Sequence, residues 1–223
     1  MRQRQGRLQG LKVAVLVADG FEQVEVTRPL RELIRQGALV DIVSLHRGRI
    51  RGMNLLYPGV RLRVNRTVDR ARAVDYDALF IPGGFVNPDF LRQSERARTF
   101  ALAFDVAGKP IATLGHGPWV LVSAGLVRGR RLAAWPGIQD DIRNAGGTWV
   151  DEPLVRDGNW VSSRSPLDLL AFERGMVELF TEAPRRSVRN VRPRPFARYR
   201  PVSVLGFLMG VGLHAAFRRA LPA

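Results

Sequence analysis

The sequence contains no cysteine, which excludes disulfide bonds, thiolate metal sites and catalysis by a thiol. Only two lysines, Lys12 and Lys109, occur among its 35 basic residues. The three histidines, His46, His116 and His214, are widely separated, which gives little support to a metal site. We therefore expect neither a metal nor a cofactor. A secretory signal is not expected either, because the apolar run behind the first ten residues is short and contains a lysine.

The formal net charge of +15 is unevenly distributed along the 223 residues. Residues 1–10 contain three arginines and no acid, and residues 183–223 contain nine arginines and no acid, so residues 11–182 carry only +3. We interpret the basic character as a property of the tails. The sequence is divided into a basic arm (1–10), a folded domain (11–182), an Arg/Pro-rich linker (183–200) and an apolar helix (201–217).

The domain alternates between apolar runs of strand length and helical patterns. Leu11–Ala18, Leu39–Leu45, Ala78–Ile81 and Pro110–Leu114 are predicted strands, and their nearly continuous apolar character is typical of parallel strands buried on both faces. Helices are expected near residues 26–36, 93–107, 118–125, 138–144 and 167–180, the last opened by a capping box at Ser165. Residues 46–75 suggest short hairpin strands, and a second hairpin is expected to join Trp149-Val150 to Trp160-Val161. This order predicts a mostly parallel sheet covered on both faces, with ligands at the carboxyl ends of its strands.

One of these carboxyl ends has the pattern of a nucleophile elbow. Thr113-Leu114-Gly115-His116-Gly117-Pro118 lies between a buried strand and a helix, which is the frame of a sharp turn that presents one side chain for attack. The residue at the tip is Gly115. The hydroxyls of Thr113 and Ser123 are near in sequence, but neither residue occupies the tip. We therefore expect no covalent catalysis at this turn.

Five motifs in order resemble the PfpI-type intracellular protease family of the DJ-1/PfpI superfamily. They are Asp19-Gly20-Phe21-Glu22-Gln23-Val24-Glu25, Ile81-Pro82-Gly83-Gly84, Gly115-His116-Gly117-Pro118, Trp135-Pro136-Gly137-Ile138-Gln139-Asp140-Asp141 and Asp157-Gly158-Asn159-Trp160-Val161-Ser162-Ser163-Arg164. They cover roughly residues 11–182. The resemblance implies a class I glutamine amidotransferase-like fold, a flavodoxin-like three-layer α/β/α sandwich with a mostly parallel sheet. It also implies self-association as a dimer or larger oligomer.

The resemblance also implies roles for individual residues. Glu22 matches a glutamate that hydrogen-bonds the nucleophilic cysteine, and Gly115 stands where that cysteine would be. His116 would assist, oriented by an acid from a neighbouring subunit for which Asp89 is the nearest match. The N–H groups of Gly84 and His116 would form an oxyanion hole, and Gly83, Gly117 and Trp135 would complete the pocket. Proteolysis, deglycation, glyoxalase and chaperone activities are reported for such proteins.

Several functional readings follow. The first is a catalytically inactive or ligand-binding family member that takes a small molecule. The alternative is a non-covalent hydrolase or lyase in which Glu22 and His116 act on a small carbonyl compound. If neither residue takes part in catalysis or binding, Glu22 only caps the helix that follows it and His116 is a structural histidine. Nucleic acid is the least favoured partner, because the basic linker contains only Phe196 and Tyr199 as aromatics.

The apolar segment 201–217 leaves its own alternatives open. As a helix its seventeen residues would span about 25 Å, short of a hydrocarbon core of about 30 Å. It would then cross a thin bilayer or lie at its surface, and the arginines on the domain side would keep the domain cytoplasmic. The other readings are a helix packed on its own domain or on a partner, and a disordered tail. We expect a cytoplasmic protein, with the cytoplasmic face of a membrane as its further location.

Overall fold

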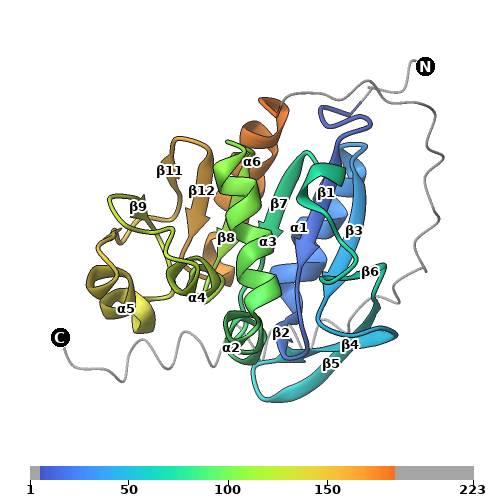
Figure 1. Cartoon of the computed structure of the whole chain (residues 1–223), viewed down its shortest axis with the longest axis horizontal. Coiled ribbons are helices and arrows are strands. Elements are labelled where there is room, and N and C mark those ends of the chain that lie inside the picture. The colour runs from blue at the N-terminus through green and yellow to red at the C-terminus, as the bar shows by residue number, and fades with distance from the viewer. Residues whose placement is uncertain (1–5, 184–223) are drawn as a thin grey trace.

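The computed structural model describes residues 6–183, which are built around a seven-stranded sheet (Figure 1). The strand order is β11-β12-β8-β7-β1-β3-β6, and every neighbouring pair is parallel except β11 with β12. These strands are β1 Lys12–Leu16, β3 Leu39–Ser44, β6 Arg66–Thr67, β7 Ala78–Ile81, β8 Ile111–Leu114, β11 Val155–Asp157 and β12 Trp160–Ser163. The predicted flavodoxin-like α/β fold with a mostly parallel sheet is confirmed.

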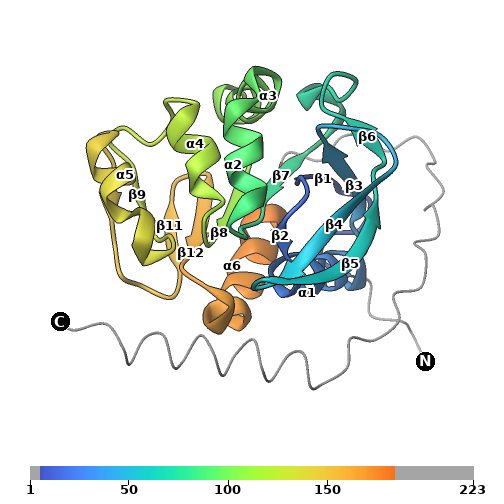
Figure 2. The same ribbon diagram turned by 90° about the horizontal axis from the view of Figure 1, so that it is seen from below.

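Helices cover both faces of this sheet and make it the middle of three layers. Figure 2 shows α1 (Gln23–Arg35) and α6 (Leu169–Thr181) on one side, and α2 (Val86–Gln93), α3 (Glu95–Val106) and α4 (Pro118–Ser123) on the other. Because successive strand residues point to opposite faces, Val13 and Val15 of β1 pack toward α1 and α6, whereas Ala14 and Leu16 pack toward α3 and α4. All four are fully buried, which explains the unbroken apolar run in the sequence.

Two smaller sheets flank the central one. The first joins β2 (Phe21–Glu22), β4 (Arg49–Asn54) and β5 (Tyr57–Arg63), so the hairpin expected within residues 46–75 is present. The second pairs β9 (Arg131–Leu132) with β10 (Thr148–Trp149) beside α5 (Gln139–Asn144). Three short 3₁₀ turns complete the described elements, at Ala73–Asp75, Pro136–Ile138 and Pro166–Asp168.

One local expectation was wrong, and a second was imprecise at its start. Trp149 does not pair across the turn at Gly158, because it lies opposite Leu132 in a parallel pair, and the first strand of that hairpin is Val155–Asp157. The helix expected at 93–107 begins at Glu95, after a separate helix α2. Ser94 separates the two helices, since its hydroxyl accepts a hydrogen bond from the N–H of Ala97 and caps α3.

The arm expected at residues 1–10 is partly a piece of the domain. Leu8 is 2% exposed, and its N–H donates to the carbonyl of Gln36 at the end of α1. Residues 1–5 of the arm, residues 184–200 of the predicted linker and all of the predicted apolar helix lie outside the described residues. Between residues 6 and 183, no helix is both long and apolar enough to cross a membrane.

Candidate functional site

The sharp turn predicted at Gly115 lies where expected, between the end of β8 and the start of α4. Gly115 has φ +61°, a left-handed conformation that glycine adopts without the penalty paid by other residues. Its N–H donates to the carbonyl of Ser163 (3.1 Å), and its carbonyl accepts from the N–H of Trp135 (2.9 Å). These two bonds hold the tip of the turn between β12 and the loop that follows β9. We call this turn and the residues around it the elbow site.

The carboxyl group beside the tip belongs to Glu25, not to Glu22. A Cβ placed on Gly115 would lie 2.9 Å from Oε1 and 3.0 Å from Oε2 of Glu25. Glu25 is 4% exposed, and its Oε2 makes no hydrogen bond within the described part of the chain. An unpaired oxygen on a buried carboxyl group is costly unless the group is neutral or binds a ligand or water.

The start of α1 decides which glutamate faces the elbow. Gly20 turns the chain with φ +75°, β2 occupies residues 21–22, and the helix begins at Gln23. Glu22 is therefore the residue before the helix, and its carboxylate accepts a hydrogen bond from the N–H of Leu55 in the β4–β5 turn (3.0 Å). Glu25 lies in the first helical turn, three residues after the expected Glu22.

Burial shifts the pKa of both carboxyl groups upward. Loss of hydration raises the pKa of Glu22 to about 7, although the N–H groups of Leu55, Val24 and Gln23 oppose the shift. The pKa of Glu25 is raised well above its ordinary value, first by burial and then by the nearby charge of Glu22. At neutral pH these effects favour a protonated Glu25, which can donate a hydrogen bond.

The loop after β7 brings Gly83 and Gly84 against the same carboxyl group. Their backbone N–H groups lie close enough to Glu25 to partly offset the rise in its pKa. A Cβ on Gly83 would lie 3.0 Å from the N–H nitrogen of His116 and would also collide with Glu25. Gly84 has φ +92°, and a Cβ there would collide with the backbone of Glu22. Both positions therefore require glycine.

Asn87, which the sequence analysis did not select, fixes this glycine loop to the end of β1. It is fully buried, and its Oδ1 accepts from the N–H of Ala18 (2.7 Å). Its Nδ2 donates to the carbonyls of Pro82 and Gly83, both at 2.9 Å. An asparagine three residues after a Pro-Gly-Gly sequence gives no signal of this role on its own.

Aromatic rings surround the half-buried His116. The ring of Trp135 stacks on it at 5.6 Å, and the rings of Trp119 and Phe85 meet it edge-on at 5.3 and 6.0 Å. Gly117 lies directly behind, where a Cβ would be 2.5 Å from the carbonyl oxygen of Ile81. The structure thus brings His116, Gly117 and Trp135 together at the elbow.

Asp89 belongs to the helix α2 that follows the glycine loop. It is exposed on α2, and its Oδ2 accepts a hydrogen bond from Gln93 of the same helix (3.0 Å). The expectation that it acts on His116 of a neighbouring subunit stays a prediction. Among residues 6–183, no three His, Asp or Glu side chains gather as ligands for a metal ion.

The sequence of residues 11–179 matches the family model described as DJ-1/PfpI family. The chain belongs to the DJ-1/PfpI family. A deglycase of Pyrococcus horikoshii is 44% identical over 169 residues, which cover 76% of this chain and 99% of that protein. The protein/nucleic acid deglycase 2 of Escherichia coli is 36% identical over 170 residues, covering 75% of this chain and 96% of that protein.

Solved structures of family members have the same fold. A two-domain protein of Anabaena variabilis, with a DJ-1/ThiJ/PfpI-like domain and a ferritin-like domain, superposes with a TM-score of 0.73 at 30% identity, covering 81% of this chain and 52% of that one. A DJ-1 superfamily protein of Salmonella typhimurium, solved as a cysteine-to-alanine mutant, gives a TM-score of 0.67 at 26% identity, covering 75% and 88%.

Proposed function

We propose that this chain is a DJ-1/PfpI family protein without covalent catalysis at the elbow, which binds a small carbonyl compound there. The observation that carries the proposal is the pairing of Glu25 with Gly115. The frame of the elbow is complete, and a buried carboxyl group faces the tip, but the tip carries no side chain that could attack. The chain has no cysteine elsewhere that could replace it.

The hydroxyl groups of Thr113 and Ser123 are not placed to replace the missing nucleophile. Thr113 is fully buried, and its Oγ1 lies behind the turn, 2.6 Å from where a Cβ on Gly117 would be. The hydroxyl of Ser123 lies at the far end of α4, where it accepts a hydrogen bond from Nε of Arg92 (2.9 Å). A serine or threonine mechanism at the elbow tip has no support in this geometry.

A carbonyl oxygen suits the donors that remain. A protonated Glu25 would supply an O–H group, and the N–H of His116 lies on the same side of the Gly83 loop. Saturation-transfer-difference NMR with hydroxyacetone, a stable small carbonyl compound, tests this. We expect a signal from the wild type that is lost in Glu25→Leu, which removes the hydrogen-bond donor, and kept in Glu95→Gln, which alters an exposed glutamate of α3. Equal signals from all three proteins would contradict the proposal.

A second function is favoured by the raised pKa of Glu25. A carboxyl group that holds its proton at neutral pH can act as a general acid, and with His116 it could move protons on an enolisable carbonyl compound without a covalent intermediate. In this second function Glu25 takes the role that the sequence analysis gave to Glu22. It requires turnover by the wild type that Glu25→Gln abolishes, whereas the first function requires binding without turnover.

Membrane association through the tail is a further proposal, supported by the sequence alone. Residues 201–217 carry no formal charge and are flanked by Arg198, Arg200, Arg218 and Arg219. Flotation of the full chain with phosphatidylglycerol vesicles tests it. We expect the chain to float with the vesicles at high salt as well as at low salt. Complete loss of co-flotation at high salt would show that only charge attraction holds the chain to the vesicles.

Self-association is also proposed. Two large side chains on and beside α2, Phe85 and Phe90, are 70% and 46% exposed on either side of the predicted partner residue Asp89. Sedimentation equilibrium of the full chain should show a dimer or larger species that dissociates on Phe85→Asp. A monomer at all concentrations would contradict this.

A further inference from the structure

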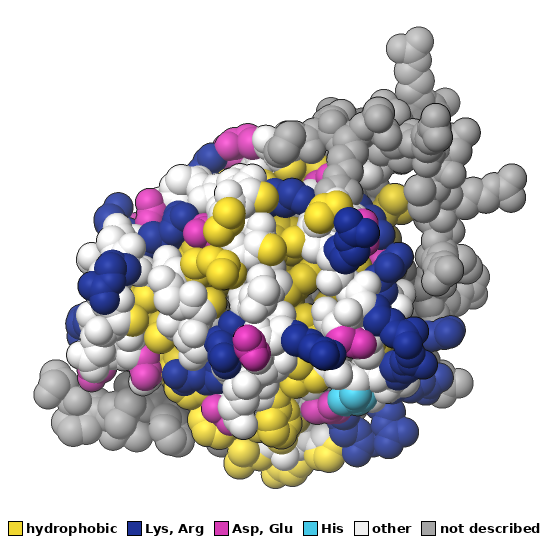
Figure 3. Space-filling model, viewed as in Figure 1, with side chains coloured by type: hydrophobic (Ala, Val, Ile, Leu, Met, Phe, Trp, Pro, Cys, Tyr) yellow, Lys and Arg dark blue, Asp and Glu magenta, His cyan; other side chains and the backbone are white. Residues whose placement is uncertain are grey.

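The small net charge of the domain conceals a strongly basic segment. Residues 47–72 contain eight arginines and one acidic residue, Asp69. Because residues 11–182 total +3 and this segment contributes +7, the remainder of the domain is net −4. All eight arginines are exposed. Figure 3 shows Lys and Arg side chains gathered on the side of the molecule where β4, β5 and β6 lie. The basic character therefore belongs to the folded domain as well as to the tails.

Arginines face one another directly across the β4–β5 hairpin. Arg49 is opposite Arg63, and Arg51 is opposite Arg61, while Ile50 and Leu62 between them are buried. Like charges placed directly opposite in an antiparallel pair destabilise it. Two such pairs in one short hairpin are unfavourable for folding, and an anion close to them would offset part of that cost.

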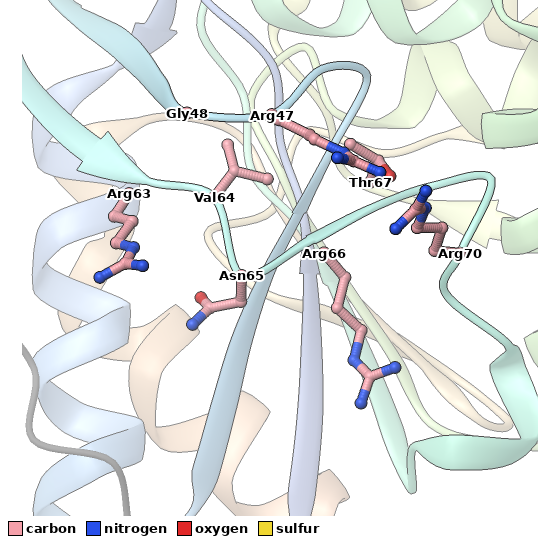
Figure 4. Close-up of a pocket in the computed structure, with 8 residues that line it drawn as sticks. All are labelled: Arg47, Gly48, Arg63, Val64, Asn65, Arg66, Thr67 and Arg70. Atoms are coloured by element: carbon pink, nitrogen blue, oxygen red, sulfur yellow. The ribbon is translucent and has the colours of Figure 1, made fainter.

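A cavity of about 450 Å³ opens beside this hairpin, between it and β6. Its lining includes the side chains of Arg47, Arg63, Arg66 and Arg70 together with Thr67, and we call it the arginine cavity. Figure 4 shows Arg47 and Arg70 extending toward Thr67 from opposite sides, whereas Arg63 and Arg66 point elsewhere in that view. The side chains of Arg47 and Arg70 therefore converge near Thr67.

Few carboxylates neutralise this cavity. Arg66 pairs with Asp41 at 3.6 Å, and Arg70 reaches Asp69 only at 4.0 Å, with the two side chains 65% and 39% exposed. Arg47 and Arg63 make no ion pair with any residue between 6 and 183. The sequence outside that range contains no aspartate or glutamate that could supply one.

We propose that the arginine cavity binds a small molecule that carries a diphosphate group. Guanidinium groups recognise phosphoryl oxygens in pairs of hydrogen bonds, and the two that converge here, Arg47 and Arg70, suit two linked phosphoryl groups in a cavity of this volume. A small ligand is favoured over a nucleic acid strand, because Tyr57 is the only aromatic residue between 47 and 72 and bases would have little to stack on. The arginine cavity is separate from the elbow site, so each proposal can fail alone.

Inorganic pyrophosphate is the probe, added to the full chain at constant ionic strength with sulfate as the reference anion. Calorimetric titration measures its affinity for the wild type, for Arg47→Gln/Arg70→Gln, and for Arg31→Gln/Arg128→Gln. The last variant removes the same charge from exposed arginines outside the cavity. We expect pyrophosphate to bind the wild type and to raise its Tm more than sulfate does. The cavity variant should bind at least about tenfold more weakly, and the control within about twofold of the wild type.

Three results would overturn the proposal. Equal effects of sulfate and pyrophosphate would show general screening of charge. An equal loss of affinity in both double variants would show a diffuse basic surface. Binding of a single-stranded oligothymidine that depends on Arg47 and Arg70, with no pyrophosphate binding, would assign the arginines to a nucleic acid surface.

Discussion

The two carboxylate oxygens of Glu25 lie 2.9 and 3.0 Å from the point where a Cβ on Gly115 would be. In this family member a glycine and a buried acid therefore stand against each other at the tip of the elbow. The contact links the first turn of α1 to the end of β8, and it determines both what the elbow can do and what a substitution there would cost.

Gly115→Ala should destabilise the domain by about 1–3 kcal/mol, because a side chain at φ +61° is strained. In a domain of this size that lowers the Tm by roughly 2–10 °C. Gly125→Ala is the matched control, since Gly125 has φ +74° and nothing lies within 4 Å of a Cβ placed there. The excess cost of Gly115→Ala over the control measures the contact with Glu25. Equal costs would show that Glu25 moves away freely.

The free energy of unfolding should fall as pH rises, because Glu22 and Glu25 both hold a proton more tightly in the folded state than in the unfolded state. Glu22 has a folded pKa of about 7 against an ordinary value of 4.5, so its contribution is present below pH 4.5 and is lost by about pH 7. Glu25 extends the loss in the same direction to higher pH.

Thermal unfolding between pH 4.5 and 9 checks this in three variants. Glu22→Gln should lessen the decline between about pH 4.5 and 7, to which both glutamates contribute. Glu25→Gln should lessen it there too, remove the part at higher pH and raise the Tm at pH 8.5 by several degrees. Glu95→Gln, an exposed change, should leave the profile unaltered. A wild-type Tm that does not depend on pH across this range would refute the assignment.

The sequence predicted the layers and the elbow, but not the acid beside it. Apolar runs such as Ala78–Ile81 identified buried strands because only a strand covered on both faces needs them. Glu22 and Glu25 are three residues apart, and which one faces Gly115 depends on whether the helix begins before or after Gln23. Helix boundaries are set by tertiary contacts, here the pairing of β2 with β4, which a single sequence does not reveal.

Asn87→Ala should cost about 3 kcal/mol or more. The substitution leaves the N–H of Ala18 and the carbonyls of Pro82 and Gly83 without their buried partner, at about 1–3 kcal/mol for an unsatisfied buried group. Asn159→Ala is the comparison, because its amide donates to the carbonyl of Lys109 in a half-buried place. Chemical denaturation measures both. A smaller loss for Asn87→Ala than for Asn159→Ala would contradict the role given to the glycine loop.

Lactate formation from methylglyoxal tests the central claim most directly. The product is measured rather than loss of substrate, because methylglyoxal also modifies arginine and nearly all of the 35 basic residues are arginines. We predict no lactate from the wild type and measurable turnover by Gly115→Cys, whose thiol would lie beside Glu25. Lactate formation by the wild type that is lost in Glu25→Gln would contradict the account, as would a folded Gly115→Cys that stays inert.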